Sequence, residues 1–308
     1  MNRKNKALSA RSYHPEGPLK SRLPLYAMLA PFCLLFFLFV ILPILSSVVL
    51  SFFSYDMISF PKWAGAANYY KMFITDGVFP VSVKNTLVFS FVTGPISFIL
   101  AFILAWMINE LGTARRSILS FMFYAPALAG NVYFIWQVLF SGDSYGYINS
   151  FLLNFSFITE PVQWFRDARY AMAIVMIVQL WLSMGVSFLA NIAGLQNVNS
   201  ELYEAGAIDG VKNRWIELWY ITLPSMRSIL LFGGVMQIQA TFSMSHIATA
   251  LTGFPSVNYS TETIVTHLID VGTIRYEMGY AAAISVFLFV LMAVVRAGIG
   301  KALNMVGK

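Results

Sequence analysis

The sequence predicts an all-α polytopic membrane protein, and three features of the chain support this prediction. Of its 308 residues, 58% are hydrophobic and only 11% are charged, against about 25% charged in a typical soluble domain. Long apolar runs recur along the chain, and each can form a helix that crosses the roughly 30 Å hydrocarbon core of a bilayer. The runs are too long and too continuously apolar for barrel strands, so helices are favoured.

Six apolar runs are predicted to be membrane-spanning helices. They lie at about 25–53, 86–108, 118–140, 171–195, 225–250 and 280–300. Prolines inside these runs, such as Pro95 and Pro126, are tolerated as kinks in membrane helices. We expect a basic cytoplasmic arm at 1–24 and one transmembrane domain at 25–308. The arm is not expected to be a signal peptide, because the apolar run after it is too long.

The positions of lysine and arginine predict that both termini are cytoplasmic. With the N-terminus inside, only six of the 20 basic residues fall in outer loops, namely Lys62, Lys71, Lys84, Arg166, Arg169 and Arg275. The others then lie on the cytoplasmic side, as the positive-inside rule requires. The net charge of +6 is therefore interpreted as charge that flanks membrane spans, and no nucleic-acid partner is expected.

The loop between the fourth and fifth spans has the sequence of two short helices lying along the membrane. Asn199 or Ser200 can cap the first helix, and Asp209-Gly210 ends it with a turn signal. Pro224 begins the fifth span, where a missing backbone N–H costs nothing. The apolar side of the second helix is predicted to be Trp215, Leu218, Trp219 and Ile221. From the residues alone, this loop is either an ordinary interfacial helix or a surface for a partner protein.

The same loop resembles the EAA loop of ABC importer permeases. The family pattern is Glu-Ala-Ala, two residues, Asp-Gly-Ala, and later a hydrophobic residue followed by x-Leu-Pro. The matching residues are Glu204, Ala205, Asp209, Gly210, Leu223 and Pro224. Gly206 and Val211 stand where the pattern has alanine. The second half of the loop is one residue longer than in the maltose-type pattern, so its register stays open, with Leu218 or Trp219 in the aromatic position.

This resemblance implies a type I ABC importer permease architecture with a cytoplasmic coupling helix in the loop 199–224, in a bacterial cell membrane. It implies three protein partners: a second homologous permease, a dimeric ABC ATPase and an extracytoplasmic solute-binding lipoprotein. ATP and magnesium are expected in the ATPase, since 298–301 lacks the spacing of a Walker A motif. The chain itself is expected to bind no cofactor or metal and to be no enzyme. The expected coupling residues are Glu204, Ala205, Gly206, Asp209, Gly210, Leu223 and Pro224.

Other segments resemble the maltose-permease-type sugar importers, namely 66–73 followed by Asn85-Thr86, 251–255 and 279–282. The resemblance implies that the cargo is a carbohydrate, first of all an oligosaccharide, moved by alternating access. A polyol or glycerol-phosphate importer of the same class is the alternative, and an ion-coupled secondary transporter is a more distant one. The spans are nearly free of ionisable residues, which disfavours ion coupling and an anionic cargo.

Polar and aromatic residues inside the spans are candidates for the cargo pathway, because sugar sites combine a few polar groups with aromatic faces. The candidates are Gln237, Gln239, Ser243, His246, Gln179, Trp181, Asn131, Tyr133 and Trp136. Taken alone, a glutamine, asparagine or histidine inside a span more often makes a helix–helix contact, and Tyr133 and Trp136 are equally explained by the aromatic belt at the membrane surface. In the last outer loop, exposure to solvent or contact with the binding protein is expected for Glu262, His267 and Asp270. None of these three is expected to be catalytic.

Overall fold

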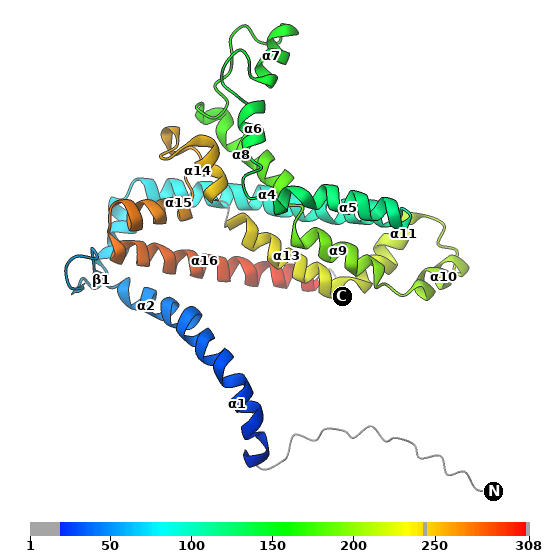
Figure 1. Ribbon diagram of the computed structural model, residues 1–308, viewed down its shortest axis with the longest axis horizontal. Helices are drawn as coiled ribbons and strands as arrows, with labels where there is room; N and C mark the ends of the chain where they lie inside the picture. The colour runs from blue at the N-terminus through cyan, green and yellow to red at the C-terminus, as the bar shows by residue number, and fades with distance from the viewer. Residues whose placement is uncertain (1–18, 243–244, 306–308) are drawn as a thin grey trace. The chain divides into compact units, whose positions relative to one another are not determined.

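The computed structural model describes residues 19–242 and 245–305 and divides the chain into two compact units, Met1–Val49 and Leu50–Lys308. The described part of the first unit is a run of helix (Figure 1): α1 (Leu19–Phe36), a π-helical stretch (Phe37–Ile41) and most of α2 (Leu42–Leu50). Apolar side chains such as Met28, Phe32 and Phe39 are exposed along it. A helix that is apolar all round is typical of a membrane span.

The second unit begins with a two-stranded antiparallel ribbon, in which β1 (Phe53–Ser54) pairs with β2 (Lys62–Trp63). The helices that follow, with π-helices and 3-10 helices labelled η, are α3 (Ala67–Tyr70), η2 (Lys71–Thr75), α4 (Val78–Asn109), α5 (Thr113–Leu128), α6 (Phe134–Leu139), α7 (Tyr147–Asn154), α8 (Ala168–Leu182), α9 (Val186–Gln196), α10 (Ser200–Ile208), α11 (Arg214–Glu217), η3 (Leu218–Thr222), α12 (Leu223–Ser225), α13 (Arg227–Phe242), α14 (Ser245–Thr252), η4 (Val257–Tyr259), α15 (Ile264–Ile269), η5 (Asp270–Ile274) and α16 (Met278–Met305).

Four helical segments within the described ranges are long and apolar enough to cross a membrane. They are Tyr26–Leu50, Val78–Asn109, Ala168–Gln196 and Met278–Gly298. A fifth is obtained if Arg214–Ser225 and Arg227–Thr252, which meet at an angle of 81°, count as one span. These segments overlap five of the six runs predicted from the sequence.

The sixth predicted run, 118–140, is not one continuous helix. α5 ends at Leu128 and α6 has only six residues, so neither helix alone has the length of a membrane span. Ala129 between them is extended, with φ −87° and ψ 109°. Pro126 removes a backbone donor from the last turn of α5, and Gly130 and Asn131 favour helix poorly. The expectation of one unbroken helix is therefore corrected to two short helices around a break.

The core of the second unit forms where α4, α9 and α13 pack against one another. Glycines let these helices approach closely. A Cβ atom added at Gly233 would lie 2.9 Å from Ser187 Oγ, and one added at Gly194 would lie 2.8 Å from both Ile229 and Met226. Small residues at helix contacts are the usual way for membrane helices to pack.

A buried network of polar side chains joins three helices at one end of this bundle. Asp76 Oδ1 accepts hydrogen bonds from the N–H groups of Val78 (2.8 Å) and Phe79 (3.1 Å), which caps α4. Asp76 Oδ2 accepts a hydrogen bond from Tyr280 OH at 2.6 Å and pairs with His267 Nε2 at 2.8 Å. Burial opposes ionisation of this carboxyl, but the bonds from Tyr280 and Val78 outweigh it and lower the pKa of Asp76. We call this side of the bundle the Asp76 end.

The expectation that Glu262, His267 and Asp270 are solvated is wrong, since they are only 3%, 1% and 9% exposed. The segment that carries them folds back onto α4. Asn85 Nδ2 donates to the carbonyls of Tyr259 (2.8 Å) and Glu262 (2.9 Å). Burial raises the pKa of Glu262, and hydrogen bonds from Thr266 and Ser256 oppose this only in part. The composition of the segment around α15 does not distinguish a buried segment from a solvated loop, so the burial of these groups could not be predicted from it.

Candidate functional site

The predicted coupling segment forms a short helix, α10, with a cap at each end. At its N-terminus, Asn199 Oδ1 accepts a hydrogen bond from the N–H of Glu201 at 3.1 Å. At its C-terminus, the N–H of Val211 bonds to the carbonyl of Gly206 and that of Gly210 to the carbonyl of Ala207. This is a Schellman motif, which requires a left-handed residue after the helix. Gly210 supplies it with φ +87°.

Gly206 is the point where α10 contacts the rest of the loop. It is buried, and a Cβ atom added to it would lie 2.7 Å from Ile221 Cδ1. Beside this contact, Tyr203 OH and Thr222 Oγ1 share a hydrogen bond of 2.9 Å. A larger side chain at Gly206 would therefore push α10 away from the helix that follows it.

The opposite face of α10 consists of Glu204, Ala205, Ile208 and Asp209, all exposed. We call these four residues the α10 face. Ile208 is 87% exposed, which is unusual for a large aliphatic side chain. Neither carboxylate of this face has a hydrogen bond or ion pair with any residue that the structure describes. The face thus combines two unpaired negative charges with a free apolar group.

The second half of the loop is fixed against α4. Leu218 is buried in a core cluster with Phe102, Phe188 and other residues of α4 and α9, while Trp219 is exposed. Trp215 contacts Trp106 with ring centroids 5.2 Å apart, although it also remains exposed. Of the four residues predicted for the apolar side of the second helix, only Leu218 is buried and Ile221 half-buried, while both tryptophans stay exposed. Leu223 packs against the same cluster, and Pro224 lies in the first turn of α12.

A cavity of about 410 Å³ with both polar and apolar lining residues lies between helices of the bundle. It is bounded by the end of α5, by α8 and α9, and by α13 and α14. Its lining residues are Pro126, Ala127, Ala129, Gly130, Tyr133, Gln179, Leu182, Ser183, Gly185, Val186, Ser187, Met236, Gln237, Ala240, His246 and Ile247. We call it the central cavity, and its volume is within the range of small-molecule sites.

Four of the predicted pathway residues line the central cavity, namely Tyr133, Gln179, Gln237 and His246. Three others do not. Trp136 and Trp181 pack against each other with centroids 5.6 Å apart, and Asn131 is exposed and accepts a hydrogen bond from Tyr133 OH. Gln239 belongs to α13, but its side chain and the whole of Ser243 lie outside the described residues.

Two buried polar atoms next to the central cavity have no hydrogen-bond partner among the described residues. They are Gln179 Oε1 and Ser187 Oγ, on side chains that are only 5% and 3% exposed. An unpaired buried polar group costs free energy, and this cost is highest in a membrane. Such groups persist where they face water or a ligand. Ser187 was not among the predicted pathway residues. Its spacing of four residues from Ser183 and of eight from Gln179 would have placed all three on one face of the predicted fourth span.

The break between α5 and α6 lies beside the same cavity and leaves an open helix end there. The last four carbonyls of an α-helix have no partner within the helix, and Pro126 and Ala127 of this turn line the cavity with Ala129 and Gly130. Irregular backbone inside a membrane is tolerated only where it faces protein or a water-filled space. The break is therefore consistent with a hydrated cavity.

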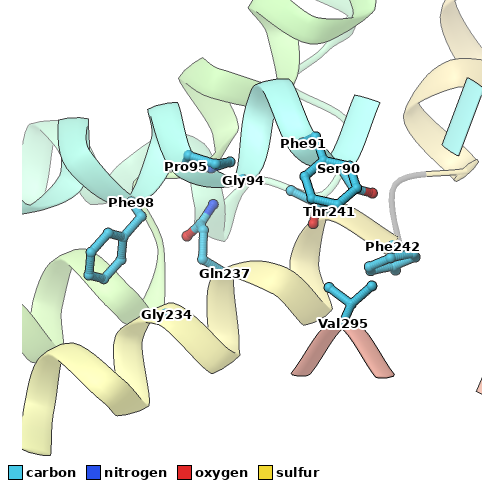
Figure 2. A pocket seen from close by; sticks show the side chains of 10 residues that line it. All are labelled: Ser90, Phe91, Gly94, Pro95, Phe98, Gly234, Gln237, Thr241, Phe242 and Val295. Carbon is cyan, nitrogen blue, oxygen red and sulfur yellow. The ribbon is translucent and has the colours of Figure 1, made fainter. Parts of the chain in front are cut away.

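Gln237 separates the central cavity from a smaller apolar crevice of about 190 Å³ between α4, α13 and α16. Figure 2 shows its side chain extending from α13 toward Gly94 and Pro95 of α4. Its Nε2 donates a hydrogen bond to Ser97 Oγ at 2.6 Å. Gln237 lines both spaces, so it is one wall of the central cavity and not a free ligand group in this structure.

The lining of the central cavity carries little charge. Among its described residues there is no lysine, arginine, aspartate or glutamate, and His246 is its one imidazole. His246 lies 6.4 Å from the ring of Tyr133, edge to face. Hydroxyl and amide groups with one aromatic face suit a neutral ligand that is rich in hydroxyl groups.

Comparisons with known proteins agree with this geometry. No protein-family model matches the chain. The chain is 32% identical to the Probable ABC transporter permease protein YesP of Bacillus subtilis, over 90% of this chain and 89% of the relative. It is 30% identical to the arabinooligosaccharides transport system permease protein AraP of the same organism, over 88% and 85% of the two chains. It is 29% identical to the lactose transport system permease protein LacF of Rhizobium radiobacter, over 87% and 90%.

The fold has a solved counterpart. A chain of a bacterial ABC transporter involved in the import of the acidic polysaccharide alginate superposes with a TM-score of 0.77, at 23% identity, covering 94% of this chain and 98% of that one. This likeness shows that the arrangement of helices is that of an ABC importer permease. Together with its apolar helices and its sequence relatives, it shows a multi-pass membrane protein, and the chain belongs to the permeases of carbohydrate ABC transport systems.

Proposed function

We propose that this chain is the translocating subunit of an ATP-driven importer for an uncharged carbohydrate, first of all an oligosaccharide. The observation that carries this proposal is the central cavity, whose described lining combines the amide of Gln179, the hydroxyls of Ser183 and Ser187 and the ring of Tyr133 without a charged neighbour. Amide and hydroxyl groups can hydrogen-bond to sugar hydroxyls, and an aromatic ring offers a surface to the C–H face of a sugar. Relatives named for lactose and arabinooligosaccharides support the same cargo class.

An anionic cargo is less well supported. One relative, 27% identical over 88% of this chain, is the sn-glycerol-3-phosphate transport system permease protein UgpA of Agrobacterium fabrum. A phosphate group is normally held by arginine, lysine or helix N-termini. The described lining of the central cavity offers no lysine or arginine. It includes the first residues of α9, Val186 and Ser187, so the glycerol-phosphate alternative has a helix N-terminus here but no cationic side chain.

The proposed topology has six spans and both termini in the cytoplasm of a bacterial cell. α5 and α6 together would form the third span, broken beside the cavity in the way that discontinuous helices form binding sites in other transporters. The positive-inside distribution then places α10 at the cytoplasmic surface and the Asp76 end outside.

The proposed energy source is a separate ABC ATPase dimer that binds ATP and magnesium and contacts the α10 face. The free carboxylates of Glu204 and Asp209 suit a basic cleft, and Ile208 adds an apolar contact. Gly206 and Gly210 fix the shape of the segment, and Leu223 and Pro224 join it to α13. A second permease and an extracytoplasmic binding protein complete the proposed assembly. The solved alginate transporter was crystallised with a periplasmic protein that holds an alginate pentasaccharide.

The test is uptake by proteoliposomes that contain this chain with its partner permease, ATPase and binding protein. We expect ATP-dependent accumulation of at least one radiolabelled neutral sugar from a panel of lactose, arabinotriose and galactotriose. Glu204→Lys should abolish uptake while ATP hydrolysis continues, because a reversed charge on the α10 face repels a basic partner.

The control is Glu160→Lys, which reverses an exposed charge on the loop between α7 and α8 and leaves α10 unchanged. It should keep most of the uptake. Normal uptake by Glu204→Lys would contradict the coupling role. Uptake of glycerol 3-phosphate with none of the neutral sugars would contradict the proposed cargo.

A further inference from the structure

A second cavity, of about 540 Å³, opens beside the segment between α6 and α8. Its lining includes Gln137 from α6, Asp143, Gln163, Trp164 and Arg166 from the α6–α8 segment, and the end of α14. We call it the outer cavity. None of these residues has a part in the transport chemistry described so far.

One buried side chain fixes the walls of the outer cavity. Asn149 is fully buried, and its Nδ2 donates to the carbonyls of Ser141, Asp143 and Val162 at 3.0–3.1 Å. Its Oδ1 accepts a hydrogen bond from Trp164 Nε1 at 2.9 Å. Both sides of the loop are therefore tied to one amide, which gives the cavity a preformed shape, as ligand sites usually have.

The outer cavity lies one helical turn beyond the central cavity along the same two helices. Tyr133, the N-cap residue of α6, lines the central cavity, and Gln137 of α6 lines the outer one. On α14, Ile247 lines the central cavity and Leu251 lines the outer one. Residues four apart lie on one face of a helix, so the two cavities are in series. Between them, Gln137 Nε2 donates a hydrogen bond to the carbonyl of Ala250 at 2.6 Å and joins α6 to α14.

The lining of the outer cavity suits a sugar. Arg166 is exposed, and its guanidinium has no hydrogen bond or ion pair with the described residues, so its donors are available. Asp143 Oδ1 accepts hydrogen bonds from the N–H groups of Tyr145 and Gly146, and its Oδ2 accepts one from Ser141 Oγ. Its charge balances that of the arginine. Trp164 supplies an aromatic wall. Donors, acceptors and an aromatic surface with no net charge match a neutral hydroxylated ring.

We propose that the outer cavity is a loading subsite for a sugar unit of the imported saccharide, separated from the central cavity by the Gln137–Ala250 hydrogen bond. This proposal rests on the proposed function. The saccharide occupies the outer cavity first, and it enters the central cavity when α6 and α14 separate and the bond between them opens.

The test is cysteine protection in the complex of this chain, its partner permease and the ATPase, without the binding protein. Cys33 is the one cysteine of the sequence, so Cys33→Ser gives a clean background for Gln163→Cys. The probe is the panel sugar that the uptake assay identifies. At twice its Kd, this sugar should slow labelling of Gln163→Cys by a membrane-impermeant maleimide about threefold. Labelling of the control Glu160→Cys, on the same loop but outside the lining, should not change.

Transport kinetics give a second readout that does not depend on the cysteine. Arg166→Gln, which leaves the hydrogen bonds within the described chain in place, should raise the KM of uptake about threefold to tenfold, as expected when one polar contact of about 1 kcal/mol is lost, and should leave the maximal rate unchanged. If the imported sugar leaves Gln163→Cys unprotected, the loading subsite is refuted while the proposed function stands. If no neutral sugar is imported, the proposed function itself fails.

Discussion

The two ends of the bundle differ in where their polar side chains point. At the Asp76 end, the carboxylate of Asp76 receives four bonds from groups of its own chain, and nearby Glu262 is buried as well. At the end that carries α10, the carboxylates of Glu204 and Asp209 point outward and have no partner in the described chain. Figure 1 shows α15 and α10 at these opposite ends.

This difference indicates that the two ends contribute differently to the protein. Interactions at the Asp76 end are complete within the chain, so changes there should affect folding stability first. The α10 face becomes complete only with another protein, so changes there should affect transport while stability is kept. The predictions below test this separation, from the largest expected effect to the smallest.

Asp76→Ala should give the largest loss of stability. It leaves the buried Tyr280 hydroxyl and His267 ring without their acceptor and removes the cap of α4, which together should cost about 3 kcal/mol. The midpoint of thermal unfolding in detergent should therefore fall by several degrees.

The matched control is Asp56→Ala. Asp56 also accepts bonds from two backbone N–H groups, those of Ile58 and Ser59, but it is exposed. Its replacement should leave the midpoint unchanged within error. Equal shifts for the two variants would show that the buried network has no special role in stability.

Gly206→Ala should have an intermediate effect that is confined to the coupling segment. The added methyl group collides with Ile221 Cδ1, and overpacking costs about 1–3 kcal/mol, against about 1 kcal/mol gained in helix propensity. Hydrogen exchange of the α10 amides should become faster while the thermal midpoint of the whole chain stays the same. In an Ile221→Ala background the same substitution should slow exchange, because the collision is removed. Faster exchange in both backgrounds would contradict this account.

Glu262→Gln should have the smallest effect, visible only as a change in pH dependence. Burial raises the pKa of Glu262 above its ordinary 4.5, so the folded chain holds this proton more tightly than the unfolded chain. Stability from this group is complete below pH 4.5 and is lost as the pH rises through the raised pKa. The stability contributed by Asp76 depends on pH in the opposite direction. The pKa of Asp76 is lowered below its ordinary 3.8, so this contribution is lost only in stronger acid.

The measurement is the thermal midpoint as a function of pH. Glu262→Gln should remove the decline above pH 4.5 and keep the loss in strong acid, while Glu160→Gln, at an exposed position, should leave the curve unchanged. If the thermal midpoint of Glu262→Gln still declines above pH 4.5, a group other than Glu262 causes the decline.

The sequence predicted the elements whose signal is local. Apolar length located five of the spans, and capping chemistry located α10, where Asn199 and Gly210 have the roles that their residue types suggest. The break after Leu128 was missed because Pro126 is tolerated inside many membrane helices. Only the structure distinguishes a kink from an interruption there.

The site was predicted in part for a similar reason. Gln179, Gln237, Tyr133 and His246 were selected as polar or aromatic residues inside spans, and all four line the central cavity. Trp136 and Trp181 were selected by the same rule, but they pack against each other. Burial of Glu262 and His267 depends on bonds such as that from Asn85, which is far away in the sequence. Local patterns carry no information on such distant partners.

The interruption between α5 and α6 has one more consequence. Part of the wall of the central cavity comes from Pro126, Ala127, Ala129 and Gly130 of this interruption. The carbonyls that an open helix end leaves without partners are the same in every amino-acid sequence. Exchange of side chains in this stretch leaves the acceptors in place as long as the helix stays open there. Selectivity for one cargo over another is then set by the side chains of the other walls, on α8, α9, α13 and α14. A permease of this design can change its cargo specificity through a few substitutions on those helices, while its main-chain acceptors stay as they are.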